Sequence, residues 1–351
     1  MTALTSSRSL VKTKETITEE GLRRSSAKLL PAGTVLLTSR ATIGFTAVAA
    51  VPLATNQGFA NLICGPRLLP EFLAVWLPTQ RDQLLKLAGG TTFKEISKST
   101  LKGVRVPVPP LDDQRRIVDL LSRAAGLKLL AEQAQVKARE LIPALFVDMF
   151  GDPATNPKGW PVTSIGGVAS YTRYGPRFPD RAYTSSEGAH ILRTTDIAFD
   201  GTVAWERCPV LAVTQKEIEK YALKPGTILI TRTGATIGKT ALFRGASKPC
   251  IAGAYLIEIG IAPHAVPEYV LHLLLSAYGQ AKLNLGTRAV AQPNVNVPTI
   301  CSISLPLPPF ELQAAFRTRV EEVANAGNLA KAAAVAAEQT SAALMSRLFA
   351  A

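Results

Sequence analysis

A glycine-rich segment behind a predicted strand is the first place in this sequence where chemistry could occur. Residues 234–240 read Gly-Ala-Thr-Ile-Gly-Lys-Thr, and phosphate-binding loops combine glycines, a lysine and a hydroxyl in this way. Such a loop has four residues between its glycines, whereas three separate Gly234 from Gly238. A similar segment at residues 39–46 lacks both the first glycine and the lysine. We therefore expect a turn between strands, with a nucleotide-dependent enzyme as the alternative.

The other residue types that catalyse reactions or bind metals are scattered. The histidines have no ligand-like spacing to cysteine, aspartate or glutamate, and the cysteines form no CxxC pair. We predict ordinary histidines, reduced thiols and solvated acids, with no cofactor, no metal and no catalytic activity. These residues are His190, His264, His272, Cys64, Cys208, Cys250, Cys301, Asp180, Asp196 and Asp200.

Residues 171–183 alternate basic and aromatic side chains in a stretch rich in glycine and proline. The sequence is Tyr-Thr-Arg-Tyr-Gly-Pro-Arg-Phe-Pro-Asp-Arg-Ala-Tyr. Arginine can pair bidentately with guanine or clamp a phosphate, and aromatic rings can pack on sugars or bases. A solvated basic loop is the alternative interpretation. The candidate nucleic-acid contacts from this region are Arg173, Tyr174, Arg177, Arg181 and Arg193.

Polar turns with basic and hydroxyl side chains form a second group of candidates. Some follow the predicted strands of the glycine-rich segments, and others precede two proline-rich segments. Basic turns at equivalent positions of two segments are suitable for contacts in a DNA groove. Alternatively, these residues only form the turns and helix caps that folding requires. These candidates are Arg40, Thr42, Thr91, Thr92 and Lys94, together with Arg232, Thr233 and Arg288.

These turns belong to an internal repeat. The segment 30–44 returns at 224–238, and the segment 106–114, Val-Pro-Val-Pro-Pro-Leu-Asp-Asp-Gln, returns at 305–313 as Leu-Pro-Leu-Pro-Pro-Phe-Glu-Leu-Gln. The first pair is offset by 193 residues (Gly33 to Gly226) and the second by 199 (Pro109 to Pro308). A duplicated unit of about 200 residues is large enough to be a domain with its own core.

The net charge of +13 is concentrated on the two globular segments. Residues 1–110 carry +8 and residues 159–310 carry +5, whereas residues 111–158 and 311–351 are each neutral. A basic pI that arose by drift would spread the charge evenly. A polyanion that contacts both globular segments explains the distribution better, because phosphate neutralisation supplies most non-specific nucleic-acid affinity.

Each copy is predicted to contain strands and short helices followed by one long helix. Residues 34–37, 47–51, 227–230 and 254–261 are predicted strands, and 70–88 and 267–285 are predicted helices. From 111 to 150 and from 311 onwards, apolar residues recur every three or four positions. A forty-residue helix is about 60 Å long, so each should pack on the other as a two-stranded coiled coil. Pro143 is expected to kink or end the first of these long helices.

The predicted fold class is α+β, with two similar mixed α/β domains, each followed by a long helix. The expected divisions are 1–110 and 159–310 for the domains, 111–150 and 311–351 for the helices, and 151–158 for a linker. No apolar run reaches the ~18–20 residues of a membrane span, and residues 1–14 lack the apolar region of a signal peptide. We expect a cytoplasmic protein without membrane contact.

The order of these motifs resembles the specificity (S) subunit of type I restriction–modification systems. The resemblance rests on Pro-Gly-Thr-Ile-Leu-Ile-Thr-Arg followed by Ala-Thr-Ile-Gly, on Leu-Pro-Leu-Pro-Pro-x-x-x-Gln opening a long helix, and on Met-Phe-Gly-Asp-Pro at 149–153 before Trp160. It implies two target-recognition domains joined by antiparallel helices, each reading half of a bipartite site in double-stranded DNA.

The resemblance also implies partners. Modification (DNA methyltransferase) subunits of the family bind S-adenosylmethionine and methylate adenine, and the restriction subunit hydrolyses ATP and cleaves DNA. The S subunit directs both the methylation and the cleavage without catalysis of its own.

The first copy is shorter at its start than the second. In the second copy 78 residues separate Trp160 from Gly238, but only 43 precede Gly44. The first recognition domain is therefore expected to lack at least 35 residues at its start, through a late start codon or damage. A truncated scaffold that binds the methyltransferase without effective DNA recognition is the alternative function.

Overall fold

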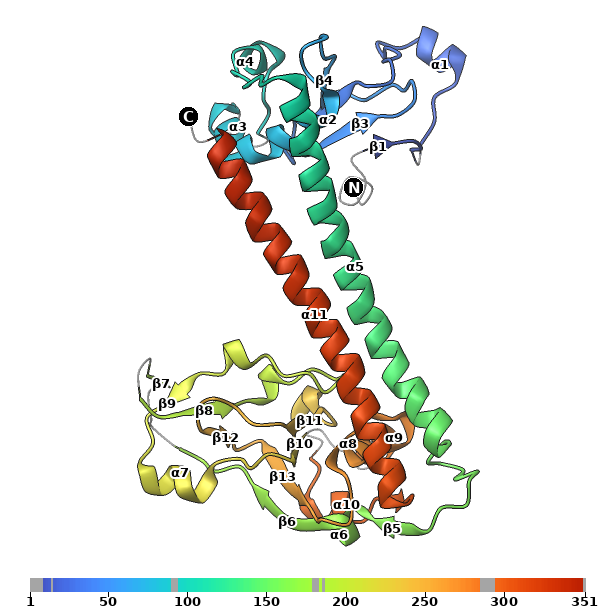
Figure 1. Ribbon diagram of the computed structural model, residues 1–351, viewed down its shortest axis with the longest axis vertical. Helices are drawn as coiled ribbons and strands as arrows, with labels where there is room; N and C mark the ends of the chain where they lie inside the picture. Colours follow the sequence, from blue (N-terminus) through green and yellow to red (C-terminus); the bar gives the residue numbers. More distant parts are fainter. Residues whose placement is uncertain are drawn as a thin grey trace. The chain divides into compact units, whose positions relative to one another are not determined.

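The computed structural model describes residues 9–13, 15–89, 94–178, 183–184, 187–284 and 294–349 (Figure 1). The chain divides into two compact units. Unit 1 comprises residues 1–131 and 330–351, and unit 2 comprises residues 132–329. The predicted fold class is confirmed, because each unit is mixed α/β and each is followed along the chain by one long helix.

Unit 1 is built on a four-stranded sheet in the order β1-β3-β2-β4. Strands β2 and β3, and β2 and β4, pair antiparallel, whereas β1 pairs parallel to β3. The core beneath the sheet is apolar and includes Val35, Leu37, Trp76 and Leu84. The elements are β1 (Ser9–Leu10), α1 (Glu19–Arg23), β2 (Val35–Thr38), β3 (Thr46–Ala49), β4 (Phe59–Leu62), α2 (Pro70–Trp76), the 3₁₀ helix η2 (Leu77–Gln80), α3 (Arg81–Leu87) and α4 (Lys98–Lys102).

Unit 2 contains the sheets β11-β10-β13-β6, β12-β8-β9-β7 and β14-β5. Its strands are β5 (Val162–Ser164), β6 (Ala169–Tyr174), β7 (Tyr183–Thr184), β8 (Ala189–Leu192), β9 (Val210–Leu211), β10 (Thr227–Thr231), β11 (Thr240–Phe243), β12 (Cys250–Ala252), β13 (Leu256–Ile261) and β14 (Ser304–Pro306). Its helices are α6 (Ile165–Val168), η3 (Thr194–Asp196), η4 (Trp205–Arg207), α7 (Gln215–Tyr221), η5 (Gly234–Thr236), α8 (Pro267–Leu275), α9 (Ala277–Asn284) and α10 (Val297–Cys301).

The two main sheets share one backbone plan. Every residue of β10 is buried, as is every residue of β2, so both are central strands with β-branched and leucine side chains on both faces. Past the end of β2, Ser39 N donates to Gly58 O at 2.9 Å, and past the end of β10, Arg232 N donates to Tyr255 O at 3.1 Å. Strands β2, β3 and β4 therefore correspond to β10, β11 and β13.

The long helices are α5 (Leu111–Phe150) and α11 (Phe310–Phe349) (Figure 1). In unit 1, Lys128 Nζ lies 3.3 Å from Glu338 Oε1. In unit 2, the Phe146 ring packs on Phe316 with centroids 5.6 Å apart. From the first contact to the second, the residue number increases on α5 and decreases on α11. The two helices are therefore antiparallel.

The structure changes what was expected of three helices. Pro143 does not end α5, which continues to Phe150, because Phe146, Met149 and Phe150 are buried in the core of unit 2 and their burial offsets the ~3 kcal/mol cost of an internal proline. The helix expected at 70–88 is divided by the 3₁₀ turn η2, which contains Pro78, and the one expected at 267–285 is divided at Ser276.

One buried glutamine attaches each long helix to its unit. In unit 1, Gln114 Oε1 accepts a hydrogen bond from Leu69 N at 2.8 Å, and its Nε2 donates to Pro109 O at 2.7 Å. In unit 2, Gln313 Oε1 accepts from Val266 N at 3.0 Å, and its Nε2 donates to Pro308 O at 2.7 Å. Both side chains are fully buried. Each amide thus joins the start of a long helix to the residue before α2 or α8.

We expect Gln313→Leu to lower the free energy of unfolding by about 2–4 kcal/mol, because it leaves the Val266 amide and the Pro308 carbonyl buried without a partner. Urea denaturation measures the change. Gln215→Leu, at an exposed position on α7, is the matched control and should change stability by less than about 0.5 kcal/mol. Equal effects of the two substitutions would contradict the assigned role of Gln313.

The burial of His272 predicts that the stability of unit 2 depends on pH. Its ring packs edge-on against Phe316 of α11 with centroids 5.4 Å apart. Burial, with a smaller contribution from the Arg244 charge, lowers the pKa of His272 to about 4. Between that value and the ordinary pKa of about 6.5, the unfolded chain binds a proton that the folded chain does not.

Stability should therefore fall by about 1–3 kcal/mol as the pH is lowered from 7 to 4.5. Urea midpoints measured across this range in the wild type and in His272→Gln test the prediction, and the variant should lose most of the dependence. His264→Gln, which replaces an exposed histidine, should retain it. A profile that His272→Gln leaves unchanged would show that another group is responsible.

Candidate nucleic-acid interface

Exposed aromatic side chains and half-buried basic side chains lie at one end of the main sheet of unit 2. At this end β6 and β10 finish while β11 and β13 begin, as the pairs Tyr174–Ile257, Thr231–Leu256 and Ile230–Thr240 show. We define the sheet-end face as Tyr174, Phe199, Arg232, Lys239 and Tyr255. Its three rings remain 42% (Tyr174), 58% (Phe199) and 53% (Tyr255) exposed.

Two cations of the sheet-end face lie over exposed rings. The guanidinium carbon of Arg232 is 4.8 Å from the centroid of Tyr174, and Lys239 Nζ is 5.3 Å from the centroid of Phe199. The Tyr174 hydroxyl also accepts a hydrogen bond from Val297 N at 3.3 Å. A cation beside an exposed ring can bind a phosphate while the ring contacts a sugar or base.

Arg232 is held rigidly but keeps a donor without a partner. Its backbone N donates to Tyr255 O at 3.1 Å, and its backbone O accepts from Val295 N at 2.8 Å. Within the described residues, the buried Nε of Arg232 has no hydrogen-bond partner. A buried unpaired donor costs about 1–3 kcal/mol.

The glycine-rich turn beside Arg232 is closed by its own hydrogen bonds. Its amides bond within the turn, because Ile237 N donates to Gly234 O at 3.2 Å, Gly238 N to Thr231 O at 3.3 Å, and Lys239 N to Thr236 O at 3.2 Å. Lys239 Nζ lies 3.3 Å from Thr194 O. Three amides at the end of the turn are therefore paired with carbonyls, and the Lys239 ammonium is directed to Thr194 O.

Unit 1 has the same turn with different side chains. Ser39 stands where unit 2 has Arg232, and Phe45 stands where it has Lys239, since Thr38 N bonds to Phe45 O as Thr231 N bonds to Lys239 O. The Phe45 ring is 39% exposed, with the Arg81 guanidinium 5.3 Å from its centroid. A cation beside an exposed ring therefore occurs in both units.

The remaining candidates of unit 1 surround this turn. Arg40 is exposed and lies 3.8 Å from Glu95 Oε2. Lys94 is exposed, and its backbone O accepts from Ala41 N at 3.2 Å. Thr42 is half-buried. Thr233 of unit 2, at the position equivalent to Arg40, forms a bridge with Asn294.

Arg173 is used inside unit 2. Its Nε donates to Glu258 Oε2 at 2.6 Å, and its terminal nitrogens donate to Lys220 O at 2.7 Å and Tyr221 O at 2.9 Å. It thereby connects β6 to β13 and to the end of α7. Burial raises the pKa of Glu258 despite this neighbour. Because its donors are engaged in the fold, we withdraw Arg173 from the interface.

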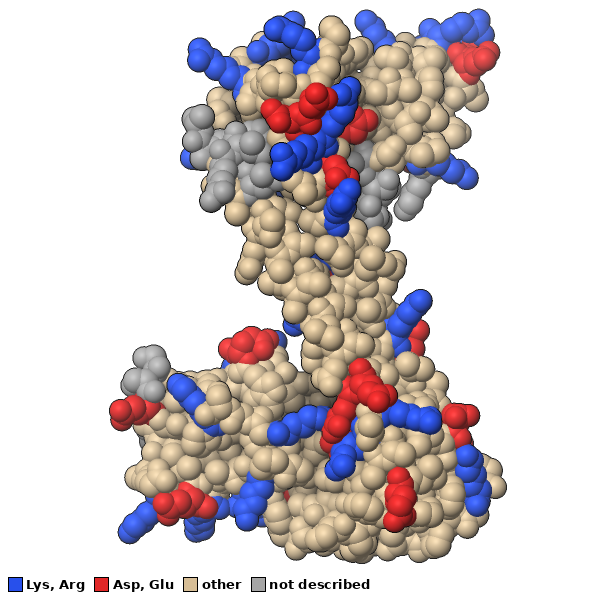
Figure 2. Space-filling model, viewed as in Figure 1, with Lys and Arg blue, Asp and Glu red and all other residues tan. Residues whose placement is uncertain are grey.

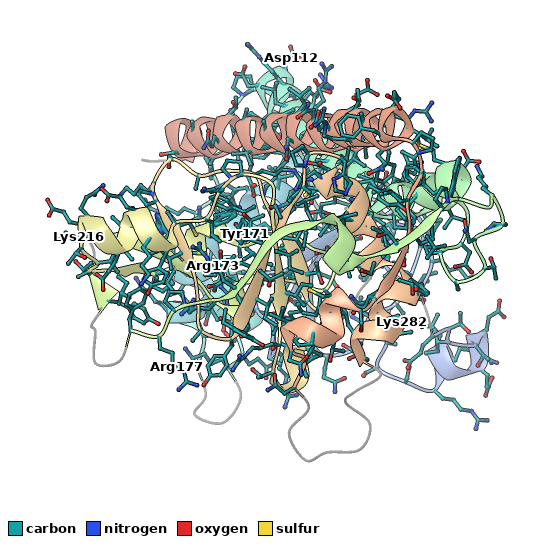
Figure 3. The ribbon with its side chains drawn as sticks, turned by 90° about the horizontal axis from the view of Figure 1, so that it is seen from below. Asp112, Tyr171, Arg173, Arg177, Lys216 and Lys282 are labelled. Carbon is teal, nitrogen blue, oxygen red and sulfur yellow. The ribbon has the colours of Figure 1, made fainter. Side chains whose placement is uncertain are left out.

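Arg193 is also engaged internally. It forms a bidentate pair with buried Asp196, at 2.9 and 2.8 Å, and donates to Arg207 O at 2.9 Å, so it too is withdrawn. Arg177, in contrast, is exposed, and Figure 3 shows its side chain pointing away from the body of unit 2 while Arg173 lies among the strands. Thr91, Thr92, Arg181 and Arg288 lie outside the described residues.

Sequence reasoning missed Phe45, Arg81, Phe199, Lys239 and Tyr255. Lys239 was set aside together with the phosphate loop. The available signal was an aromatic or basic residue directly after each Ala-Thr-Ile-Gly segment. Figure 2 shows, on the face in view, basic side chains over both units, while the visible stretch of the long helices is mostly uncharged.

The described residues offer little for metal or thiol chemistry. Among them no group of three His, Cys, Asp or Glu could hold a metal ion. Cys208 and Cys250 are buried free thiols, and burial raises the pKa of each to about 12, so both stay protonated. Within the same ranges, the helices are too short or too polar to cross a bilayer.

We expect Arg173→Ala to destabilise unit 2 by about 3 kcal/mol, because it leaves the buried Glu258 carboxylate unpaired. At temperatures where the variant stays folded, its DNA affinity should equal that of the wild type. Arg177→Ala should do the opposite, with unchanged stability and weaker DNA binding. Thermal unfolding measures the stability of the two variants, and fluorescence anisotropy with a labelled duplex measures their DNA affinity. Weaker DNA binding by Arg173→Ala and lower stability of Arg177→Ala would contradict the roles assigned to these two residues.

Comparisons with known proteins identify the family. The model of the type I restriction modification DNA specificity domain matches residues 4–137 and again 157–326. The chain therefore belongs to the type I restriction–modification DNA specificity family and carries the domain twice.

Individual relatives agree with this assignment. The type I restriction enzyme MjaIX specificity subunit of Methanocaldococcus jannaschii is 36% identical in an alignment of 171 residues, which covers 43% of this chain and 39% of the relative. The MjaVIII specificity subunit of the same organism is 24% identical over 67% of this chain and 59% of the relative. The chain thus spans between 39% and 59% of the length of these relatives.

A solved structure shows the same fold. The type I restriction–modification S subunit from M. genitalium superposes with a TM-score of 0.57 at 16% identity, covering 92% of this chain and 84% of that one. The likeness supports the arrangement of mixed α/β units and long helices that the sequence predicted.

Proposed function

We propose that this chain is a sequence-specific DNA-binding subunit that reads a bipartite site in double-stranded DNA. Each unit supplies one half of the recognition through the turns at its sheet end. The proposal includes the domain division expected from the sequence, with recognition domains at 1–110 and 159–310 joined through the long helices.

The sheet-end face of unit 2 is the observation that carries the proposal. It combines two cations, three exposed rings and the unpaired Nε of Arg232 on a backbone fixed by hydrogen bonds. Cations supply salt-dependent affinity for phosphates, and a planar guanidinium can distinguish base edges. The sequence segments that contain the two sheets carry +8 and +5, which suits a polyanionic ligand.

The same proposal assigns the partners. DNA methyltransferase (modification) subunits and the restriction ATPase/endonuclease subunit would act where this chain binds, and the chain itself would contribute no catalysis. Family membership supports this assignment, as does the engagement of the glycine-rich turn in its own hydrogen bonds. The long, charge-neutral helices α5 and α11 are suitable surfaces for protein partners.

The double variant Arg232→Ala/Lys239→Ala should bind a labelled duplex at least tenfold more weakly at low salt. The slope of log K against log salt should become shallower by about 2, because each lost phosphate contact removes about one released counterion. Filter binding between 50 and 300 mM KCl measures both quantities. Arg319→Ala/Lys331→Ala, at exposed positions on α11, removes the same charge and should leave both nearly unchanged.

Equal losses in the two double variants would indicate general electrostatics and would contradict a DNA-binding role for the sheet-end face. Undetectable DNA binding by the wild type, with retained capture of a methyltransferase subunit through the long helices, would favour the scaffold alternative. Nucleotide binding that Lys239→Ala abolishes would favour the enzyme alternative.

A further inference from the structure

Three arginines of unit 2 differ in what their guanidinium groups contact. Arg173 on β6 is bonded to Glu258 and to backbone carbonyls at the end of α7, and Arg193 pairs bidentately with Asp196. Within the described part of the chain, nothing accepts a hydrogen bond from the guanidinium of Arg232, and no carboxylate pairs with it. Its Nε is buried, whereas its two terminal nitrogens remain accessible. Arg232 therefore keeps a pair of donors for a ligand.

The guanidinium of Arg232 is nevertheless held in place. The backbone of this residue is fixed on both sides, by Tyr255 O at 3.1 Å and by Val295 N at 2.8 Å. Its guanidinium carbon lies 4.8 Å from the centroid of the Tyr174 ring. That ring is tied to α10, because the Tyr174 hydroxyl accepts a hydrogen bond from Val297 N at 3.3 Å. A planar group that is already oriented loses less freedom when it binds.

Lys239, the other cation of the sheet-end face, has a different chemical capacity. Its Nζ lies 3.3 Å from Thr194 O and 5.3 Å from the centroid of Phe199. An ammonium group is a point charge with rotating donors on a flexible stem, which suits a phosphate. The planar fork of an arginine instead matches O6 and N7 of guanine in the major groove, which is the commonest specific contact between proteins and DNA.

We propose that Arg232 determines sequence specificity by reading a guanine in the half-site of unit 2, that Tyr174 positions it, and that Lys239 supplies phosphate affinity only. This inference rests on the proposed function and deepens it, because it divides the sheet-end face into a residue that reads a base and a residue that does not. In unit 1 the buried Ser39 stands at the position of Arg232, so this guanine contact is a property of unit 2.

In vitro selection from random duplexes with the full chain tests the proposal. The wild-type motif should contain a guanine that Arg232→Lys, which keeps the charge, discriminates about tenfold less well. The other positions of the motif and the slope of log K against log salt should stay unchanged. Lys239→Ala should weaken binding to all duplexes alike and make the slope shallower by about 1, with the same motif.

Two further substitutions separate positioning from folding. Tyr174→Leu removes the ring and should lower the discrimination at the same guanine, whereas Tyr174→Phe keeps the ring and should retain most of it. Arg173→Lys is the matched control for the exchange of arginine by lysine. It should lower the melting temperature and leave the motif unchanged, because the donors of Arg173 are bonded within the fold. Arg232→Lys should melt as the wild type does.

The outcomes distinguish this inference from the proposed function. A motif that Arg232→Lys leaves unchanged, or a guanine preference that Lys239→Ala removes, would overturn the division of roles while DNA recognition by the chain would stand. A wild-type chain that binds all duplexes equally would overturn both the inference and the proposed function.

Discussion

Each long helix is fixed to its unit by one buried glutamine, and the other features of the unit depend on this attachment. The Gln114 and Gln313 amides bond to the proline-rich segment before the helix and to the residue before α2 or α8. A proline-rich segment has few backbone donors of its own. A side-chain amide can pair with its carbonyl and with an amide of another element at once, which is why this residue recurs in both copies.

The repeated backbone of the two units is compatible with the proposal that one fold serves two recognition tasks. The backbone bonds that hold the sheet-end turns are repeated, because Ser39 and Arg232 donate to equivalent carbonyls and accept from equivalent amides of Ile96 and Val295. The side chains on this shared backbone differ, with serine in one unit and arginine in the other. A constant frame with variable side chains is what two different half-sites require.

Much of the architecture could be predicted from the sequence. The repeat revealed two copies, and β-branched runs and apolar spacing predicted the central strands β2 and β10 and both long helices. The expectation that α5 could end at Pro143 was wrong, because the local penalty of a proline is visible in sequence, while the aromatic packing of Phe146, Phe150 and Phe316 that offsets it depends on residues far apart in the chain.

The candidate site was harder to predict for the same reason. Arg173 and Arg177 look alike in a basic loop, but the register of β6 on β13 places Arg173 against buried Glu258. Lys239 was discounted with the phosphate loop, although its position at the start of β11 brings it beside Phe199. The composition of the sequence shows which segments are basic. The sheet register is needed to distinguish basic side chains that are bonded within the fold from those that remain available to a ligand.

If two copies of one frame read two separate DNA half-sites, in vitro selection from random duplexes should reveal both. We expect an enriched motif of two conserved blocks separated by a fixed, unconserved spacer, and selection with Arg232→Ala/Lys239→Ala should relax one block and preserve the other. A single uninterrupted block, or loss of both blocks in the variant, would contradict it.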